Sequence, residues 1–298
     1  MSSRSVERSL SENPTGVLTR HFSVLAVMIS GIVGAKSTNL SYISRRTSNY
    51  RTEEERGLTG GEMKLTLYRG VAIEPAAVND TIRAIRRYGL LGNEGTWKFN
   101  IPNMDEVRHR IPEILASEKP SINDIFSETP LTGICACGDE TGGRYYALKH
   151  NTSKDKTASI LVTLEVDIAD IYIDCRDFLC SAFQFWDRKK KSPSEKQTVT
   201  LAELFGQDII PYFERCQSTS DQDIRVAMCN LASFDTMVVK EHYQNKRVIG
   251  GRHGTRFCSA FFVKTPILSS CIRECKHIVG PFAEPEVYID VYGFHNLV

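Results

Sequence analysis

Residues 157–168 read TASILVTLEVDI and carry the clearest structural pattern of the chain. Successive side chains of a β-strand point to opposite faces, so regular alternation of apolar residues marks a strand with one buried face. Here that face would carry Ile160, Val162, Leu164 and Val166. We therefore predict a strand over this stretch, with those side chains in the core.

Four further stretches have the composition of strands. Residues 64–68 (KLTLY) alternate and end at Arg69-Gly70, and the others cover residues 131–137, 255–264 and 287–291. The predicted strands are short and scattered along the chain, which favours a sheet built from distant segments.

Helical patterns lie between these strands. Residues 75–88 place apolar side chains at helical spacing, with Pro75 in the first turn and Gly89 after the last. Further helices are predicted over residues 104–115, with a kink at Pro112, and over residues 140–150 and 266–275. Because strands and helices mix without regular βαβ spacing, we expect an α+β fold rather than a doubly wound parallel sheet.

The first sixty or so residues differ in character from the rest. Ser23 to Gly34 (SVLAVMISGIVG) is apolar, but it follows a polar start that contains arginines. It is also shorter than the roughly 20 residues that a membrane span needs, so we predict a buried helix. Residues 45–61 are charged and end in Gly60-Gly61, which indicates a linker. The expected division is an N-terminal helical segment with its linker at 1–61 and a main domain at 62–298.

The composition is that of a soluble globular protein, with 298 residues of which 41% are hydrophobic and 24% charged. A net charge of +1 gives no global attraction to nucleic acid or to an anionic membrane. The nine cysteines are scattered and lack C-x2-C spacing, which favours free thiols and a cytoplasmic location over disulfides or structural zinc. Phosphate-binding glycine loops, the zinc-protease H-E-x-x-H motif and the hydrolase G-x-S-x-G motif do not occur in the sequence.

Three short pieces nevertheless occur in a suggestive order. They are Leu67-Tyr68-Arg69-Gly70, then GICACGDE at 133–140 with Tyr145-Tyr146 on the following helix, then AEPEVYI at 283–289. This order resembles the ADP-ribosyltransferase superfamily, in the branch with an Arg on the first strand, a Ser-Thr-Ser strand followed by a helix, and a Glu-x-Glu turn entering a late strand. The resemblance spans residues 64–292 and implies a split β-sheet core with flanking helices. Cys135-Ala136-Cys137 departs from it, because it replaces Ser-Thr-Ser and removes the hydroxyl groups.

Arg69 is the candidate for holding NAD. A guanidinium can bind phosphate oxygens at two points, and Gly70 beside it would permit close approach of the ligand. In the family that the chain resembles, aromatic residues at the positions of Tyr145 and Tyr146 stack on the nicotinamide ring. The alternatives are an ordinary surface ion pair for Arg69 and core packing for the two tyrosines.

Glu286 is the candidate for the catalytic carboxylate. As nicotinamide leaves, the ribosyl group becomes a cation of oxocarbenium type, which a carboxylate stabilises. Glu284 would orient and deprotonate an acceptor. In the family that the chain resembles, a Glu at this position is typical of the enzymes that modify arginine. The alternative is that both side chains merely flank the turn at Pro285 in solvent.

The resemblance implies a glycosyltransferase that consumes NAD and passes ADP-ribose to a protein or nucleic-acid acceptor, or to water as an NAD glycohydrolase. It also implies a toxin or defence effector, with an inhibitor or antitoxin as a further partner; neither a metal nor a membrane partner is expected. The alternative is a non-catalytic interaction or nucleic-acid-associated protein linked to a mobile element. That alternative draws on residues 21–40, which resemble the amino-terminal segment of some insertion-sequence transposases.

Overall fold

The computed structural model describes residues 63–91, 110–117, 132–149, 157–174, 178–184, 193–251 and 256–297. All of them belong to one compact unit, Asn49–Val298. Several predictions lie outside the described residues: the apolar helix at 23–34, the transposase-like stretch at 21–40, the linker at 45–61 and the first part of the helix at 104–115.

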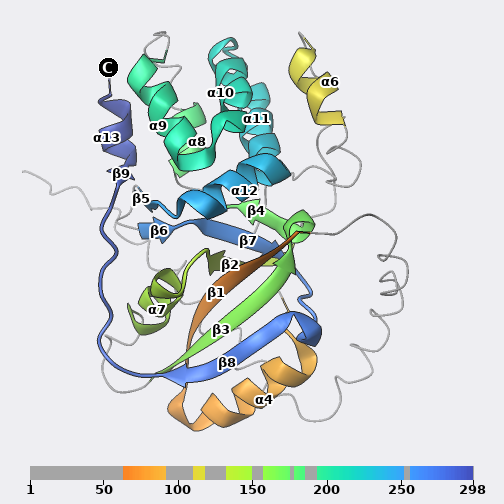
Figure 1. The fold of residues 1–298 in the computed structure, drawn as a ribbon, viewed down its shortest axis with the longest axis vertical. Coiled ribbons are helices and arrows are strands. Elements are labelled where there is room, and N and C mark those ends of the chain that lie inside the picture. Colours follow the sequence, from red (N-terminus) through yellow and green to blue (C-terminus); the bar gives the residue numbers. More distant parts are fainter. Residues whose placement is uncertain are drawn as a thin grey trace, which may run out of the picture. The chain divides into compact units, whose positions relative to one another are not determined.

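A six-stranded antiparallel sheet forms the centre of this unit (Figure 1). Its strands are β1 (Lys64–Ile73), β2 (Gly133–Cys137), β3 (Ala158–Asp167), β4 (Ile171–Ile173), β7 (Ala260–Lys264) and β8 (Ile272–Ile278). They lie in the order β4-β7-β2-β1-β3-β8. Helices surround the sheet, so the predicted α+β mixture of helix and sheet is confirmed, and the sheet is antiparallel.

The sheet consists of two well-bonded halves that meet at a narrow junction. In one half, β1 pairs with β3 along all of its ten residues, and β8 adds to the far side of β3. In the other half, β7 pairs with β2 on one side and with β4 on the other. Between the halves, β1 and β2 share one register pair, Tyr68↔Cys137. We call this place the junction.

The strand predicted at 157–168 is confirmed as β3, with the expected alternating face buried. The opposite face is buried as well in the first half of the strand, where Leu161 has no exposed surface. It packs with Ala147 and Leu148 of the helix α7 (Glu140–Lys149). A sheet face covered by a helix excludes water, which explains the double burial.

The helix predicted at 75–88 is also confirmed. It begins with the 3-10 turn η2 (Pro75–Ala77) and continues as α4 (Val78–Tyr88), and Gly89 ends it with a φ of 75° that favours glycine. α4 packs against β8, where Arg86 Nη2 donates a hydrogen bond of 2.9 Å to the Cys275 carbonyl.

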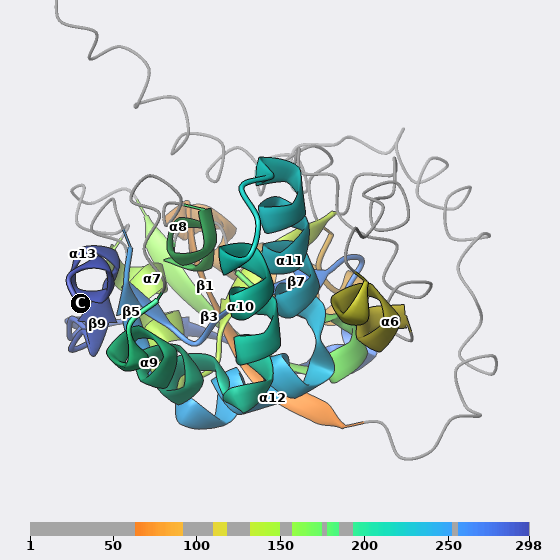
Figure 2. The same cartoon turned by 90° about the horizontal axis from the view of Figure 1, so that it is seen from above.

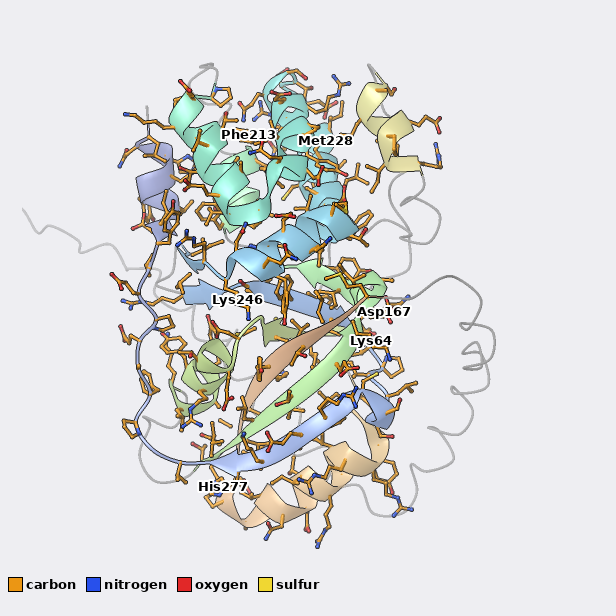
Figure 3. All side chains as sticks on the ribbon, in the orientation of Figure 1. Lys64, Asp167, Phe213, Met228, Lys246 and His277 are labelled. Atoms are coloured by element: carbon orange, nitrogen blue, oxygen red, sulfur yellow. The ribbon has the colours of Figure 1, made fainter. Side chains whose placement is uncertain are left out.

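Five helices that the sequence patterns did not predict pack together beside the β4 and β7 half (Figures 1 and 2). They are α8 (Phe178–Gln184), α9 (Glu195–Phe205), α10 (Ile210–Gln217), α11 (Gln222–Phe234) and α12 (Thr236–Asn245), with the 3-10 turn η8 (Gln207–Ile209) between α9 and α10. Their apolar side chains form a second core rich in phenylalanine. Phe213 of α10 and Met228 of α11, which Figure 3 labels, are both fully buried there.

The segment predicted as one strand at 255–264 forms two strands in different sheets. β6 (Arg256–Cys258) belongs to a three-stranded sheet with β5 (Val248–Gly250) and β9 (Ile289–Asp290), whereas β7 belongs to the central sheet. The chain turns between them at Ser259, whose φ is 42°. The strand predicted at 287–291 is short because the Asp290 carboxylate caps the helix α13 (Val291–His295) at its start.

The prediction of a helix at 266–275 is wrong. This segment forms the 3-10 turn η9 (Ser269–Cys271) and most of the edge strand β8. An edge strand keeps charged side chains in solvent, as Arg273 of β8 does in its ion pair with Glu165 of β3, so its apolar pattern is weak. Pro112 lies in the first turn of α6 (Ile111–Ala116), a position that suits proline, and the part of the predicted helix before Arg110 lies outside the described residues. A last 3-10 turn, η6 (Ile168–Asp170), joins β3 to β4.

His242 of α12 is a buried titratable group in the second core. Its Nδ1 lies 2.7 Å from the Leu204 carbonyl oxygen, and its ring stacks on Phe205 with the centroids 4.5 Å apart. Burial lowers the pKa of His242 to about 4, although the hydrogen bond to Leu204 acts in the opposite direction. The native state therefore leaves this ring neutral well below the pH at which an unfolded histidine takes up a proton.

We predict that acid destabilises the protein through His242. Between pH 6.5 and 4 the unfolded state binds a proton that the native state does not, so the free energy of unfolding falls as the pH is lowered through this window. The loss from this residue between pH 7 and pH 5 is about 2 kcal/mol. Urea unfolding at several pH values measures it. His242→Asn keeps a donor for Leu204 but does not titrate, and an unchanged pH slope in that variant would contradict the assignment.

Candidate functional site

The junction is where the first two pieces of the resemblance come together. Arg69 is the residue of β1 next to the single register pair, and its Nη1 donates a hydrogen bond of 2.6 Å to the Cys135 carbonyl of β2. Its side chain thus bridges β1 and β2 beyond the point where their backbone pairing ends. A charged donor to a carbonyl gives a stronger contact than a neutral one, so Arg69 helps to hold the two halves together.

A carboxylate lies on the other side of Cys135. The Cys135 thiol donates to Asp174 Oδ2, with 3.6 Å between sulfur and oxygen. Asp174 directly follows β4, and its backbone N–H donates to the Ala260 carbonyl at 3.0 Å, which continues the β4 and β7 pairing by one residue. The backbone of the sheet therefore fixes Asp174 beside β2.

Tyr146 of α7 lies close enough to Cys135, Cys137 and Asp174 for their charges to act on it. We call these four residues, together with Arg69, the cluster. Its hydroxyl donates a hydrogen bond of 2.5 Å to the Arg256 carbonyl of β6. Burial, first, and then the neighbouring Cys137, Tyr145, Asp174 and Cys135 raise the pKa of Tyr146, so it stays protonated as a hydrogen-bond donor.

Cys137 is buried at the junction itself. Burial is the main cause that raises the pKa of its thiol; Asp139 and Cys135 raise it further, while Arg69 acts in the opposite direction. Because the thiolate is the reactive form of cysteine, this residue is not suited to act as a nucleophile. Asp139 has a structural role here, since its Oδ1 accepts a hydrogen bond of 2.6 Å from the Gly142 N–H in the first turn of α7.

Arg256 ties the third piece of the resemblance to this cluster. Its Nη1 lies 2.9 Å from Glu284 Oε2 in an ion pair and donates to the Pro285 carbonyl at 3.1 Å. Contacts therefore lead from Tyr146 through Arg256 to Glu284, whose side chain is 58% exposed. Such an exposed pair contributes little stability, so its main effect is to set the position of the carboxylate.

Glu286 stands apart from this arrangement. It lies in irregular chain ahead of β9, and its side chain is exposed. Within the described ranges it makes no ion pair. Two short series of contacts result: Arg69 and Asp174 both contact Cys135, and Tyr146 and Glu284 both contact Arg256. Glu286 belongs to neither series.

Gly70 and Tyr145 occupy packed positions. A Cβ on Gly70 would come within 2.2 Å of the Gly143 carbonyl oxygen and 2.4 Å of the Ala147 nitrogen, so α7 fills the space that we expected a ligand to use. Tyr145 is 2% exposed and makes edge contacts with the rings of Tyr146 and Phe282, as in core packing. Of the two tyrosines, Tyr146 keeps some exposed surface and is half-buried.

Asp174 and Arg256 were missed by the sequence reasoning. Asp174 follows the apolar run Ile171–Ile173. A charged residue directly after a buried strand could have indicated a candidate site residue. Arg256 had no such signal, because its position depends on the turn at Ser259 that divides β6 from β7.

A surface hollow of about 490 Å³ lies away from the junction, beside the C-terminal end of α7 and the end of β8. Its lining includes Leu148, Ser159, His277, Ile278 and Phe282, and none of the junction residues. Figure 3 labels His277 at this end of β8. The hollow is mostly apolar and open, and it has no arginine to bind a phosphate, so we place the candidate site at the junction.

No protein-family model, no curated protein and no solved structure matches the chain. In the part of the chain that the structure describes, no helix has both the length and the apolar character needed to cross a membrane. The same residues include no group of three or more His, Cys, Asp or Glu side chains placed to hold a metal ion.

We predict that Gly70→Ala destabilises the protein by about 3 kcal/mol, because the added methyl group would meet the backbone of α7, which cannot move aside as a side chain can. Gly293→Ala is the matched control, since its nearest neighbour would be 3.3 Å away and the change should stay within about 1 kcal/mol. Urea unfolding of both variants measures the difference. Equal stability of the two would show that α7 does not pack on β1 as described.

Proposed function

We propose that the protein binds NAD at the junction and breaks the bond between nicotinamide and ribose. ADP-ribose then passes to a macromolecular acceptor or to water. The observation that carries this proposal is the two-halved sheet with Arg69 bridging its halves. It agrees with the split sheet, and with the arginine on its first strand, that the resemblance implies.

The chemistry of the cluster supports the same reading. NAD carries a negative pyrophosphate, for which a fixed guanidinium is a suitable partner. A guanidinium has five N–H groups, so a hydrogen bond from Arg69 to the Cys135 carbonyl is compatible with binding phosphate as well. Tyr146 is half-buried, and its hydroxyl is held by the Arg256 carbonyl; of the two candidate tyrosines it is the one with surface left to contact the nicotinamide ring.

The changed middle motif keeps part of the polar character that it replaces. In place of Ser-Thr-Ser, the Cys135 thiol donates to Asp174, and the Cys135 carbonyl accepts from Arg69. A thiol is a weaker hydrogen-bond donor than a hydroxyl, but it can likewise orient a charged neighbour, here the Asp174 carboxylate.

Glu284 is the residue that we assign to the acceptor. It is exposed at the rim of the cluster and is oriented by Arg256. A carboxylate in that position can accept a proton from an incoming nucleophile. We place this activity in the cytoplasm because the scattered cysteines favour a reducing compartment, and the resemblance implies the setting of a toxin or defence effector held by an inhibitor.

The direct test is the release of nicotinamide from NAD by the purified full chain. We predict that Arg69→Lys weakens NAD binding by about tenfold or more, because an ammonium cannot make the two-point contact of a guanidinium. Arg273→Lys, on the outer strand β8, is the control and should bind NAD like the parent. The affinity is measured by calorimetric titration on variants whose melting curves match the parent. NAD affinity unaffected by Arg69→Lys would reject its role, and an unmodified protein that neither binds NAD nor releases nicotinamide would favour the non-catalytic alternative.

A second prediction separates transfer from hydrolysis. Glu284→Gln keeps an acceptor for Arg256 but removes the base, so transfer to a small guanidine such as agmatine should fall by about 10²-fold. Hydrolysis of NAD should change by no more than about threefold, because water attack on a ribosyl cation has less need of a base. Nicotinamide release with and without agmatine gives both rates. An equal loss of both would contradict an acceptor role for Glu284.

A further inference from the structure

We infer that Asp174, rather than Glu286, supplies the carboxylate that stabilises the ribosyl cation. This inference rests on the proposed function and names the group that carries out its central step. It begins from the placement of the two carboxylates: that of Asp174 is held at the end of β4 beside Cys135, and that of Glu286 is exposed on irregular chain.

Asp174 and Arg69 flank the same residue. Arg69 donates to the carbonyl of Cys135, and the thiol of Cys135 donates to Asp174. In NAD the ribose that bears nicotinamide is joined directly to the pyrophosphate. The group that binds the pyrophosphate and the group that faces the ribosyl cation must therefore be neighbours in the protein. Arg69 and Asp174 each contact Cys135, and the charges of both act on the Cys137 thiol, so the two groups lie close to one another at β2.

The electrostatic setting favours Asp174 for the same task. It is half-buried, and a carboxylate partly removed from water acts on a nearby charge more strongly than an exposed one does. Its charge already acts on the cluster, because it is among the groups that raise the pKa values of Cys137 and Tyr146 behind the leading effect of burial. Glu286 is exposed, so solvent and salt screen its charge.

The step can be written in full. The bond between C1′ of the ribose and the ring nitrogen of nicotinamide breaks, and both bonding electrons leave with nicotinamide. The positive charge of the ring thereby moves to the ribosyl group, where the Asp174 carboxylate faces it. An oxygen or nitrogen of the acceptor, or of water, then forms the new bond to C1′ and gives up one proton, which Glu284 or solvent accepts.

Cys135 acts as a positioning residue in this account. Its thiol orients the Asp174 carboxylate, and serine at the same place would keep a donor of similar reach. Cys135→Ser should therefore keep the turnover of the parent within about threefold, whereas Cys135→Ala, which removes the donor, should lower kcat and leave KM nearly unchanged.

Asp174→Asn is the main test. The amide keeps an oxygen that can accept from Cys135 but loses the charge, so kcat for nicotinamide release should fall by about 10²-fold or more while NAD affinity changes little. Asp167→Asn is the matched control. Asp167 also lies at the end of a strand and accepts from the Ala169 N–H at 2.8 Å, but it is opposite Lys64 in the strand register, at the outer end of β1 and β3 (Figure 3). This variant should keep the turnover of the parent.

The outcomes distinguish the inference from the function on which it rests. If the parent neither binds NAD nor releases nicotinamide, the proposed function fails. If the parent is active and a folded Asp174→Asn keeps more than a tenth of its kcat, the inference is overturned. Should Asp174→Asn not fold, Asp174→Ser removes the same charge and is judged by the same limit. Glu286→Gln completes the set: loss of turnover there returns the role to Glu286 and overturns the inference, and full turnover supports it.

Discussion

The contact on which the arrangement depends is the hydrogen bond from Arg69 to the carbonyl of Cys135 across the junction. Backbone pairing between the two halves of the sheet is limited to Tyr68↔Cys137. Next to this pair, the Arg69 side chain connects β1 to β2 in place of backbone hydrogen bonds. A hydrogen bond from a charged donor is stronger than one between neutral groups, which gives the arginine a structural role as well as making it a candidate ligand. The same residue thus links the fold to the site.

The surroundings of the junction follow from close packing. Gly70 and Gly143 let α7 lie directly on β1, and Tyr146 of α7 is near enough to the two cysteines of β2 for them to raise its pKa. The pairing of β4 with β7 sets Asp174 beside Cys135 from the other side. A positive group, a negative group and an aromatic ring are therefore held by regular elements and not by loops, which is the rigidity that electrostatic catalysis needs.

How far the sequence could predict this arrangement depended on how each element is buried. β3 and α4 were predictable because each has a regular apolar period, as at Ile160 and Val162. α11 was not predictable, because it is buried on several sides and even its Arg225 is buried. No single apolar stripe therefore marks this helix in the sequence. Arg69 was found from its strand, but Asp174 and Arg256 reach the site through strand order and a turn, which local patterns do not encode.

The central claim is that the junction binds NAD, and the most direct measurement is an experimental structure of the full chain with NAD or a non-hydrolysable analogue. The account predicts pyrophosphate oxygens within hydrogen-bond distance of the Arg69 guanidinium, and the nicotinamide ribose facing Asp174 with Tyr146 against the ring. A dinucleotide seated instead in the hollow beside His277 and Phe282, or no bound dinucleotide at saturating concentration, would contradict it.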